Sequence, residues 1–245
     1  GVRCALLICE DTWLPAAPAR ARATGAELVL SLHASPFQSA KGDLRADMLR
    51  GNVCGQGMAV VACNLVGGQD ELVFDGQSQA LDAQGRLAAR APSFVEDLLL
   101  VTVERGDDGT LALAGSIAPV LERLPEIYQA LMLGIRDYIG KNGFGGVVLG
   151  LSGGIDSALT LALAVDALGA ERVRTVMMPS PYTAEISLTD AKDMASRLGV
   201  KYEVLPIAPC FDAFRETLAS TFAGLTEDLT EENIQARIRG TLLMA

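Results

Sequence analysis

The sequence predicts an α/β protein whose second half forms a doubly wound parallel sheet. From residue 124 onward, apolar runs of strand length alternate with helical patterns, as in parallel sheets covered by helices on both faces. A glycine-rich loop at 149–157 lies directly between one such strand and the next helix. The first half shows short strands, two helical stretches and glycine-rich turns. Because 50% of the 245 residues are hydrophobic, we expect a sizeable core.

The first half is expected to be rich in strands. Lys41–Gly55 and the Ala- and Arg-rich stretch Pro15–Thr24 predict helices, and Gly67–Gly85 is rich in turn residues that suit hairpins at a sheet edge. The apolar runs of strand length are Ala5–Ile8, Leu28–Leu32, Met58–Leu65, Leu72–Phe74, Ser78–Leu81 and Leu98–Val103.

The second half begins with an amphipathic helix over Leu124–Asn142, in which apolar residues recur about every four positions and Gly143 can end the helix. The charged turn Arg105–Gly109 and the stretch to Pro119 have no clear period. We therefore predict two domains, 1–110 and 119–245. The alternating elements that follow are strands Val147–Leu151, Val173–Met178 and Tyr202–Ile207, and helices Ser157–Leu168 and Ser187–Leu198.

The composition excludes several classes of protein. A formal net charge of -10 argues against a nucleic-acid binder, although backbone N–H groups can still bind nucleotide phosphates. No apolar run reaches the roughly 18 residues of a membrane span. The five cysteines are odd in number and form no CxxC pair, which predicts neither a disulfide framework nor a zinc site, and suits a reducing cytoplasm. Both ends fall inside element patterns, so we expect a piece of a longer protein.

The loop between strand and helix is the sharpest motif. Its small residues let the backbone approach an anion closely, and the helix then presents its free N–H groups and dipole to that anion. Asp156 repels phosphate directly, so a Mg²⁺ ion that joins Asp156 to phosphate oxygens explains its presence. A simple glycine turn with a capped helix would account for one Gly and one cap only. The residues predicted to bind phosphate, which the resemblance below assigns to ATP, are Gly150, Leu151, Ser152, Gly153, Gly154, Ile155, Asp156 and Ser157.

This loop resembles the SGGxDS signature of the ATP pyrophosphatase family, whose members split ATP between the α and β phosphates and release AMP. Two further segments, 178–188 and 230–240, resemble those of NAD+ synthetases. The resemblance implies that Asn233 contacts deamido-NAD and that Arg237 and Arg239 hold phosphate or a neighbouring subunit. It also implies a homo-oligomer assembled through the synthetase domain, with the helices at 124–142 and 230–240 on the shared surface.

The segment Ile8–Trp13 places a cysteine at the end of a strand, followed by two acids, a Thr and an aromatic residue. It resembles the nucleophile elbow of the nitrilase family, which serves as the glutaminase domain of glutamine-dependent NAD+ synthetases. The resemblance implies that Cys9 attacks the glutamine amide and releases ammonia. By the same resemblance, Ser35 and Lys41 hold glutamine. The family's catalytic Glu and Lys come from earlier in its sequence and are not in this chain.

The resemblance implies a partial nitrilase-like α-β-β-α sandwich followed by an adenine nucleotide α-hydrolase-like sheet. The implied reaction joins deamido-NAD, ATP and nitrogen from glutamine or free ammonia into NAD+. Two alternatives stay open: a GMP-synthetase-like amidotransferase with the same loop, and a nucleotide-binding fragment without turnover. His33, where the family more often has Asn, is expected to be structural, because no Ser or Cys partner pattern surrounds it.

Overall fold

The computed structural model describes residues 1–226 and 228–245. The chain forms two compact units, Gly1–Tyr138 and Ile139–Ala245, and each is described by itself. Within the described residues, no helix has the length and apolar character needed to cross a membrane.

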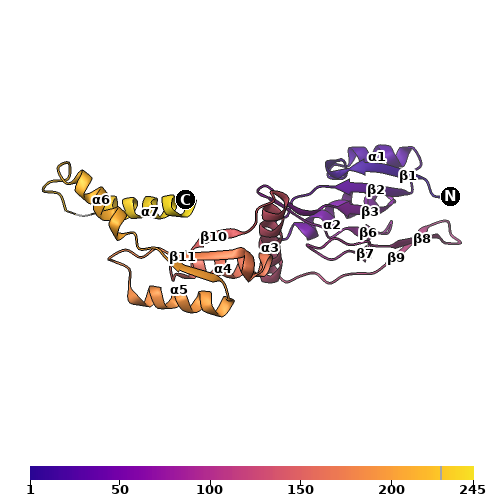
Figure 1. The fold of residues 1–245 in the computed structure, drawn as a ribbon. Helices are drawn as coiled ribbons and strands as arrows, with labels where there is room; N and C mark the ends of the chain where they lie inside the picture. Colours follow the sequence, from indigo (N-terminus) through magenta and orange to yellow (C-terminus); the bar gives the residue numbers. More distant parts are fainter. Residues whose placement is uncertain (227) are drawn as a thin grey trace. The chain divides into compact units, whose positions relative to one another are not determined.

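The first unit is built on a five-stranded sheet with the strand order β1-β2-β3-β6-β7 (Figure 1). Strands β1, β2 and β3 are parallel, so their carboxyl ends meet at one edge of the sheet. Strand β6 pairs antiparallel with β3, and β7 pairs antiparallel with β6. The strands are β1 (Cys4–Ile8), β2 (Leu28–His33), β3 (Ala59–Asn64), β6 (Gln79–Leu81) and β7 (Leu87–Arg90). Two hairpins accompany the sheet, β4–β5 (Val66–Gln69 and Leu72–Asp75) and β8–β9 (Val101–Arg105 and Leu111–Gly115).

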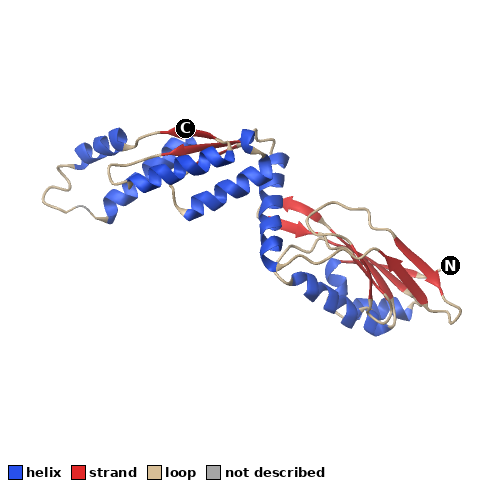
Figure 2. Ribbon diagram, turned by 90° about the horizontal axis from the view of Figure 1, so that it is seen from below, coloured by secondary structure: helices blue, strands red, loops and turns tan. Residues whose placement is uncertain are grey.

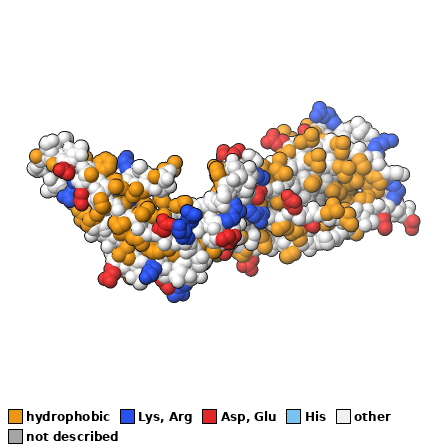
Figure 3. Space-filling model, in the orientation of Figure 1, with side chains coloured by type: hydrophobic (Ala, Val, Ile, Leu, Met, Phe, Trp, Pro, Cys, Tyr) orange, Lys and Arg blue, Asp and Glu red, His pale blue; other side chains and the backbone are white. Residues whose placement is uncertain are grey.

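Helices α1 (Ala16–Ala23) and α2 (Lys41–Asn52) pack on one face of this sheet. Short 3₁₀ helices, η1 (Cys9–Thr12) and η2 (Cys54–Gln56), follow β1 and α2. The core of this layer includes Ala26, Val29, Leu49, Val53, Met58, Val60 and Leu81. Alternate residues of β1 and β2 are exposed on the opposite side, among them Leu6, Ile8 and Leu32. Hydrophobic side chains are accordingly prominent on the surface of this unit (Figure 3).

Helix α3 (Arg123–Lys141) packs most of its length on the first unit. Its residues Ala130 and Leu133 form a cluster with Phe94, against which Phe37 and the β4–β5 hairpin pack. The approach is close at Gly68, where a Cβ atom would lie 3.2 Å from the Gly134 Cα. The helix ends as predicted at Gly143, which has a φ of 71° and donates its N–H to the Gly140 carbonyl.

The second unit is built on a parallel sheet with the order β10-β11-β12. Figure 2 shows helices beside its strands. Helices α4 and α5 lie on one side of the strands and α7 on the other (Figure 1). On the side of α7, the hydrophobic core consists of Val176, Met178, Ile207, Phe211 and Ile238. The elements are β10 (Val147–Gly150), β11 (Val173–Met177) and β12 (Lys201–Val204), helices α4 (Ile155–Leu168), α5 (Glu185–Leu198), α6 (Ala208–Leu218) and α7 (Leu229–Met244), and η3 (Ala170–Arg172).

The α/β class and the parallel sheet of the second half are confirmed, but several boundaries differ. Strand β9 lies in the stretch for which the sequence showed no period, and β12 ends at Val204, three residues before its predicted end at Ile207. Asp228 caps α7 by accepting from the Thr230 N–H, while Glu231 accepts from the Asp228 N–H. The two compact units divide after Tyr138, later than the predicted 110–119 boundary, because α3 packs mainly on the first unit.

Candidate active sites

Cys9 lies where β1 ends and the 3₁₀ helix η1 begins, with no connecting residue between them. Its φ of 43° is unusual for a residue other than glycine. The turn is held locally: Asp11 accepts a hydrogen bond from the Ile8 N–H at 2.9 Å, and the Thr12 hydroxyl donates to the Cys9 carbonyl at 2.8 Å. A side chain on a sharp, strained strand-to-helix turn projects from the sheet edge, which is the geometry of a nucleophile elbow.

Lys41 is brought beside this elbow through an aromatic contact. Its Nζ lies 5.7 Å from the centre of the Trp13 ring, close enough for a cation–π interaction. Lys41 is the first residue of α2, and Ala40 before it also adopts a left-handed conformation with a φ of 66°. Two strained residues, Cys9 and Ala40, therefore flank the same corner of the first unit.

Ser35 lies just beyond the end of β2 and is buried. Its N–H donates to the Asn64 side chain at 3.0 Å, and the Asn64 amide in turn donates to Asp75 and to the Gly76 carbonyl. Asp75 forms a buried, two-pronged ion pair with Arg45 of α2. Because a buried carboxylate without its partner is costly, this network fixes the loop that carries Ser35.

His33 is the last residue of β2 and is buried, and its Nδ1 atom has no hydrogen-bond partner among the described residues. Burial, followed by the positive charge of Arg45, holds its pKa below the usual range, so the ring is neutral. Contrary to the sequence analysis, it has a serine partner: Nε2 lies 2.8 Å from the Ser31 hydroxyl. Ser31 is two residues away on the same face of β2, a pattern visible only once this stretch is known to be a strand.

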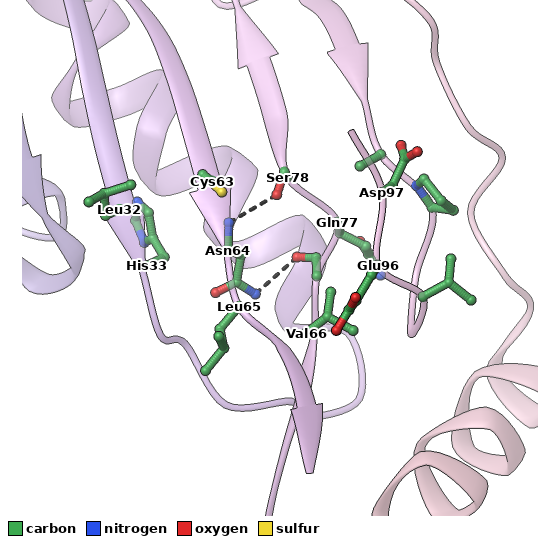
Figure 4. Close-up of a pocket in the computed structure, with 14 residues that line it drawn as sticks. Leu32, His33, Cys63, Asn64, Leu65, Val66, Gln77, Ser78, Glu96 and Asp97 are labelled. Atoms are coloured by element: carbon green, nitrogen blue, oxygen red, sulfur yellow. Dashed lines mark hydrogen bonds between the residues drawn. The ribbon is translucent and has the colours of Figure 1, made fainter. Parts of the chain in front are cut away.

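A pocket of about 400 Å³ opens at the carboxyl ends of β2 and β3 (Figure 4). Asn64 lies at its centre and donates to the Ser78 hydroxyl through its backbone and to the Gly76 carbonyl through its side chain. Glu96 and Asp97 face it from a neighbouring segment. Cys9, Ser35 and Lys41 do not line this pocket. The structure thus places Lys41 beside the elbow and Ser35 on the Asn64 network, without joining the three predicted residues around one cavity.

The loop of the second unit connects β10 to α4. The hydroxyls of Ser152 and Ser157 lie 3.0 Å apart, Ser157 donates to the Gly154 carbonyl, and the Gly154 N–H donates to Ser152. The two serines therefore brace the loop. The N-cap residue Gly154 makes no side-chain cap bond to α4, in contrast to a simple capped helix, so the first N–H groups of α4 lack a side-chain cap and can bind an anion.

Gly153 cannot be replaced by a larger residue. It has a φ of 82°, and a Cβ atom would clash with the backbone of Ser187 at the start of α5. Asp156 follows in the first turn of α4 and is exposed. Among the described residues no group of three His, Cys, Asp or Glu could hold a metal ion. The donors present suit an ion such as Mg²⁺, which takes one carboxylate and fills its other positions with water and phosphate oxygens.

A second cavity, of about 430 Å³, lies beside this loop within the second unit. Three predicted residues, Gly150, Leu151 and Ser152, form one wall. Its other walls come from the end of β11, from the segment that follows β11 and from α7. The lining residues there are Val176, Met177, Met178, Thr183, Ala236, Arg239, Gly240 and Leu243. The Arg239 guanidinium donates to the Met178 carbonyl at 3.0 Å, and burial lowers its pKa. The cavity lies at the carboxyl ends of parallel strands, where such sheets bind ligands.

Asn233 lies one turn before this cavity on the exposed side of α7 and is not among the lining residues. Its amide donates to the Leu229 carbonyl, and Arg237 reaches its side-chain oxygen at 3.3 Å. Both polar residues are therefore held in place on the helix surface. Gly153–Ser157 lie at the start of α4, next to the cavity wall formed by Ser152.

Comparison with known proteins finds a matching family for each half of the chain. Residues 1–111 match the carbon-nitrogen hydrolase family, and residues 127–245 match NAD synthase. The chain is 43% identical over 244 residues to the glutamine-dependent NAD(+) synthetase of Acinetobacter baylyi, and 39% identical over 276 residues to that of Thermotoga maritima. All of this chain is covered, with 45% and 48% of those proteins.

A solved structure also matches nearly the whole chain. The glutamine-dependent NAD+ synthetase of Acinetobacter baumannii, in complex with ADP, matches 98% of this chain and 45% of its own, with a TM-score of 0.92 and 46% identity. Over its whole length the chain is similar to glutamine-dependent NAD+ synthetases. It spans about half the length of the curated relatives that it matches. A synthetase from Cytophaga hutchinsonii, 22% identical with a TM-score of 0.76, shares the fold.

Several residues of these candidate sites were missed by sequence reasoning. Arg45 repeats the basic residue Lys41 one helical turn later, which could have indicated a buried partner. Its partner Asp75 had been read as hairpin structure, but it forms the ion pair that supports the Ser35 loop. In α7, Ala236 and Gly240 line the second cavity at a spacing of four.

Proposed function

We propose that the whole protein makes NAD+ from deamido-NAD with ATP, using nitrogen from glutamine or free ammonia, and releases AMP, pyrophosphate and glutamate. The observation that carries this proposal is the presence, in one chain, of a strained cysteine elbow and of a serine-braced phosphate loop beside a cavity. The cysteine elbow supports the release of ammonia from glutamine, and the phosphate loop with its cavity supports the ATP-dependent step. The names of the relatives support the same assignment.

In the proposed glutaminase step, the Cys9 thiolate attacks the side-chain carbonyl of glutamine, and the amide nitrogen leaves as ammonia after protonation. A thioester forms, and water hydrolyses it to glutamate and restores the thiol. Lys41, held near the elbow by Trp13, suits the carboxylate of glutamine, and Ser35 offers a hydroxyl. The Ser35 hydroxyl is buried without a hydrogen-bond partner, as expected of a group that awaits a polar ligand.

In the proposed synthetase step, ATP lies with its phosphates on the 150–157 loop and its adenosine part in the 430 Å³ cavity. The carboxylate of deamido-NAD attacks the α-phosphate, and pyrophosphate leaves. Ammonia then displaces AMP from the adenylate and yields the amide. The N–H groups of α4 and the Ser152 and Ser157 hydroxyls bind the phosphates, and Asp156 would hold Mg²⁺. The ion, when bound, supplies neutralisation of phosphate charge.

We further propose that residues 1–110 and 119–245 are the functional domains, that the protein acts in the cytoplasm, and that neither nucleic acid nor membrane is a partner. The carbon-nitrogen hydrolase match ends at 111 and the NAD synthase match begins at 127, which supports this division. The acidic net charge of -10 supports the exclusion of nucleic acid.

A product assay tests the proposal. The complete protein, given deamido-NAD, ATP, Mg²⁺ and glutamine, is expected to form NAD+ and AMP in equal amounts, as measured by chromatography. XMP offered instead of deamido-NAD should give no amidated nucleotide. Amidation of XMP would indicate a GMP-synthetase-like enzyme, and binding of ATP without pyrophosphate exchange would indicate a protein that binds nucleotide without turnover.

Asn233→Ala is expected to raise the KM for deamido-NAD about 10-fold, the value of roughly one lost hydrogen bond, while the KM for ATP stays unchanged. Steady-state kinetics with each substrate varied in turn measure this. Thr241→Ala, two turns later on the same helix, is the control and should leave both constants unaltered. An unchanged KM for deamido-NAD in the Asn233 variant would remove this residue from the site.

The proposed homo-oligomer assembles through the synthetase domain, with α3 and α7 on the shared surface. Leu124 and Leu131 of α3 are exposed apolar residues, which supports this assignment. Light scattering of the complete protein is expected to give at least twice the mass of one subunit. A monomer at micromolar concentration would contradict the assembly, without affecting the assignment of the reaction.

A further inference from the structure

The conformation of Cys9 needs support from outside its own turn. A residue other than glycine with a φ of 43° is strained, and such a conformation persists only where the surrounding structure determines it. In addition, β1 passes directly into η1 at this residue, so a small backbone rotation would redirect the thiol. The contacts of the Cys9 peptide therefore decide where its sulfur lies.

Thr12 provides the nearest contact. Its hydroxyl donates to the Cys9 carbonyl at 2.8 Å, and the residue is only 1% exposed, so water does not compete for this bond. A carbonyl held in this way fixes the backbone rotation that follows the Cα atom of Cys9. Thr12 itself lies three residues beyond the nucleophile, with its hydroxyl engaged by the backbone.

Asn52 connects this contact to the rest of the unit. Its side-chain amide donates to the Thr12 carbonyl at 3.0 Å, from 40 positions later in the sequence. Asn52 is the last residue of α2, and Lys41, which lies over Trp13, is the first. One helix therefore contacts the elbow at both of its ends, so the separation between the thiol and Lys41 depends on how α2 is docked.

We propose that Thr12 and Asn52 are positioning residues for Cys9: they form a chain of two hydrogen bonds from α2 to the carbonyl of the nucleophile and hold the thiol in its reactive direction. The proposal rests on the proposed role of Cys9 in glutamine hydrolysis. Neither residue is assigned contact with glutamine. Their loss should therefore slow the chemical step and leave glutamine binding nearly intact.

Thr12→Val keeps the shape of the side chain and removes the hydroxyl. In the complete protein it is expected to lower kcat for glutamate release by about 10- to 100-fold, because a misplacement of about 1 Å has effects of that size. The KM for glutamine should stay within roughly 3-fold, the pattern of an interaction that matters only in the transition state. Thr12→Ser restores the donor and should recover most of kcat. The formation of NAD+ from added ammonia should be unchanged in Thr12→Val and in Thr12→Ser.

Thr24→Val is the matched control, because Thr24 makes the same bond to a carbonyl three residues earlier, at the end of α1. It should leave kcat unaltered. Asn52→Ala is the second test and should lower kcat in the same direction, which keeps the proposal open to refutation if Thr12→Val does not fold.

Two results would overturn the proposal: a kcat within about 2-fold of the unmodified enzyme for both Thr12→Val and Asn52→Ala, or a Thr12→Ser variant as slow as Thr12→Val. Cys9→Ala, measured alongside, separates this failure from failure of the proposed function. If Cys9→Ala abolishes glutamate release while the positioning variants have no effect, only the positioning role fails. If Cys9→Ala retains glutamate release, the glutaminase assignment itself fails.

Discussion

Cys9→Ala in the complete protein is expected to lower glutamine-dependent NAD+ formation by roughly 10⁴-fold or more, because no thioester can form without the thiolate. Formation of NAD+ from added ammonium should stay within about 3-fold of the unmodified enzyme, since the adenylate remains open to dissolved ammonia. The comparison of the two nitrogen sources at saturating ATP and deamido-NAD measures both effects in one preparation.

Cys4→Ala is the control for this variant, because Cys4 lies on the same strand β1 but at its opposite end. It should leave both reactions intact. A Cys9 variant that still used glutamine at a comparable rate would make Cys9 a structural thiol. Equal loss of both reactions would indicate either a misfolded variant, which thermal unfolding detects, or obligatory coupling of the two sites.

Asp156→Ala is expected to abolish NAD+ formation from both nitrogen sources, because the proposed carboxylate link between Mg²⁺ and the phosphates is lost before the adenylate forms. Exchange of labelled pyrophosphate into ATP, in the presence of deamido-NAD, should disappear as well. Asp156→Asn keeps the shape but removes the charge, so it should be nearly as impaired. Glutamate release at Cys9 reports whether the variant is folded.

Asp166→Ala provides a matched control on the same helix α4, at a position remote from the loop. It should retain pyrophosphate exchange. Near-normal exchange in the Asp156 variant would refute the metal-bridging role and would leave the helix N–H groups and the two serines as the phosphate-binding elements.

The elements with a clear hydrophobic period were predictable from the sequence. Helix α3 was predicted within one residue at each end, because its apolar residues recur about every four positions. Strand β9 was missed because Leu111–Gly115 is short and mostly Ala and Leu, so its partner β8, rather than its own pattern, makes it a strand. A strand that is specified by its hairpin partner in this way shows no hydrophobic period of its own.

The chemistry of the candidate sites was predictable only where a motif is continuous in the sequence. The loop 149–157 was found because its glycines and serines are adjacent. The left-handed conformation of Cys9 was not predicted, because the contacts around its turn join residues far apart in the sequence, such as the bond from the Asn52 amide to the Thr12 carbonyl. The Arg45–Asp75 pair joins residues 30 positions apart and became visible only in the folded unit. Helix α7 was recognised, but its cap at Asp228 was not.

The most direct test of the account follows the nitrogen atom. The complete protein is given glutamine labelled with ¹⁵N in its side-chain amide, together with deamido-NAD and ATP, and the NAD+ formed is examined by mass spectrometry. The account predicts that the carboxamide of NAD+ carries ¹⁵N and that one AMP appears for each NAD+. It would be contradicted if no NAD+ formed, if NAD+ formed from labelled glutamine alone were unlabelled, or if ADP replaced AMP as the nucleotide product.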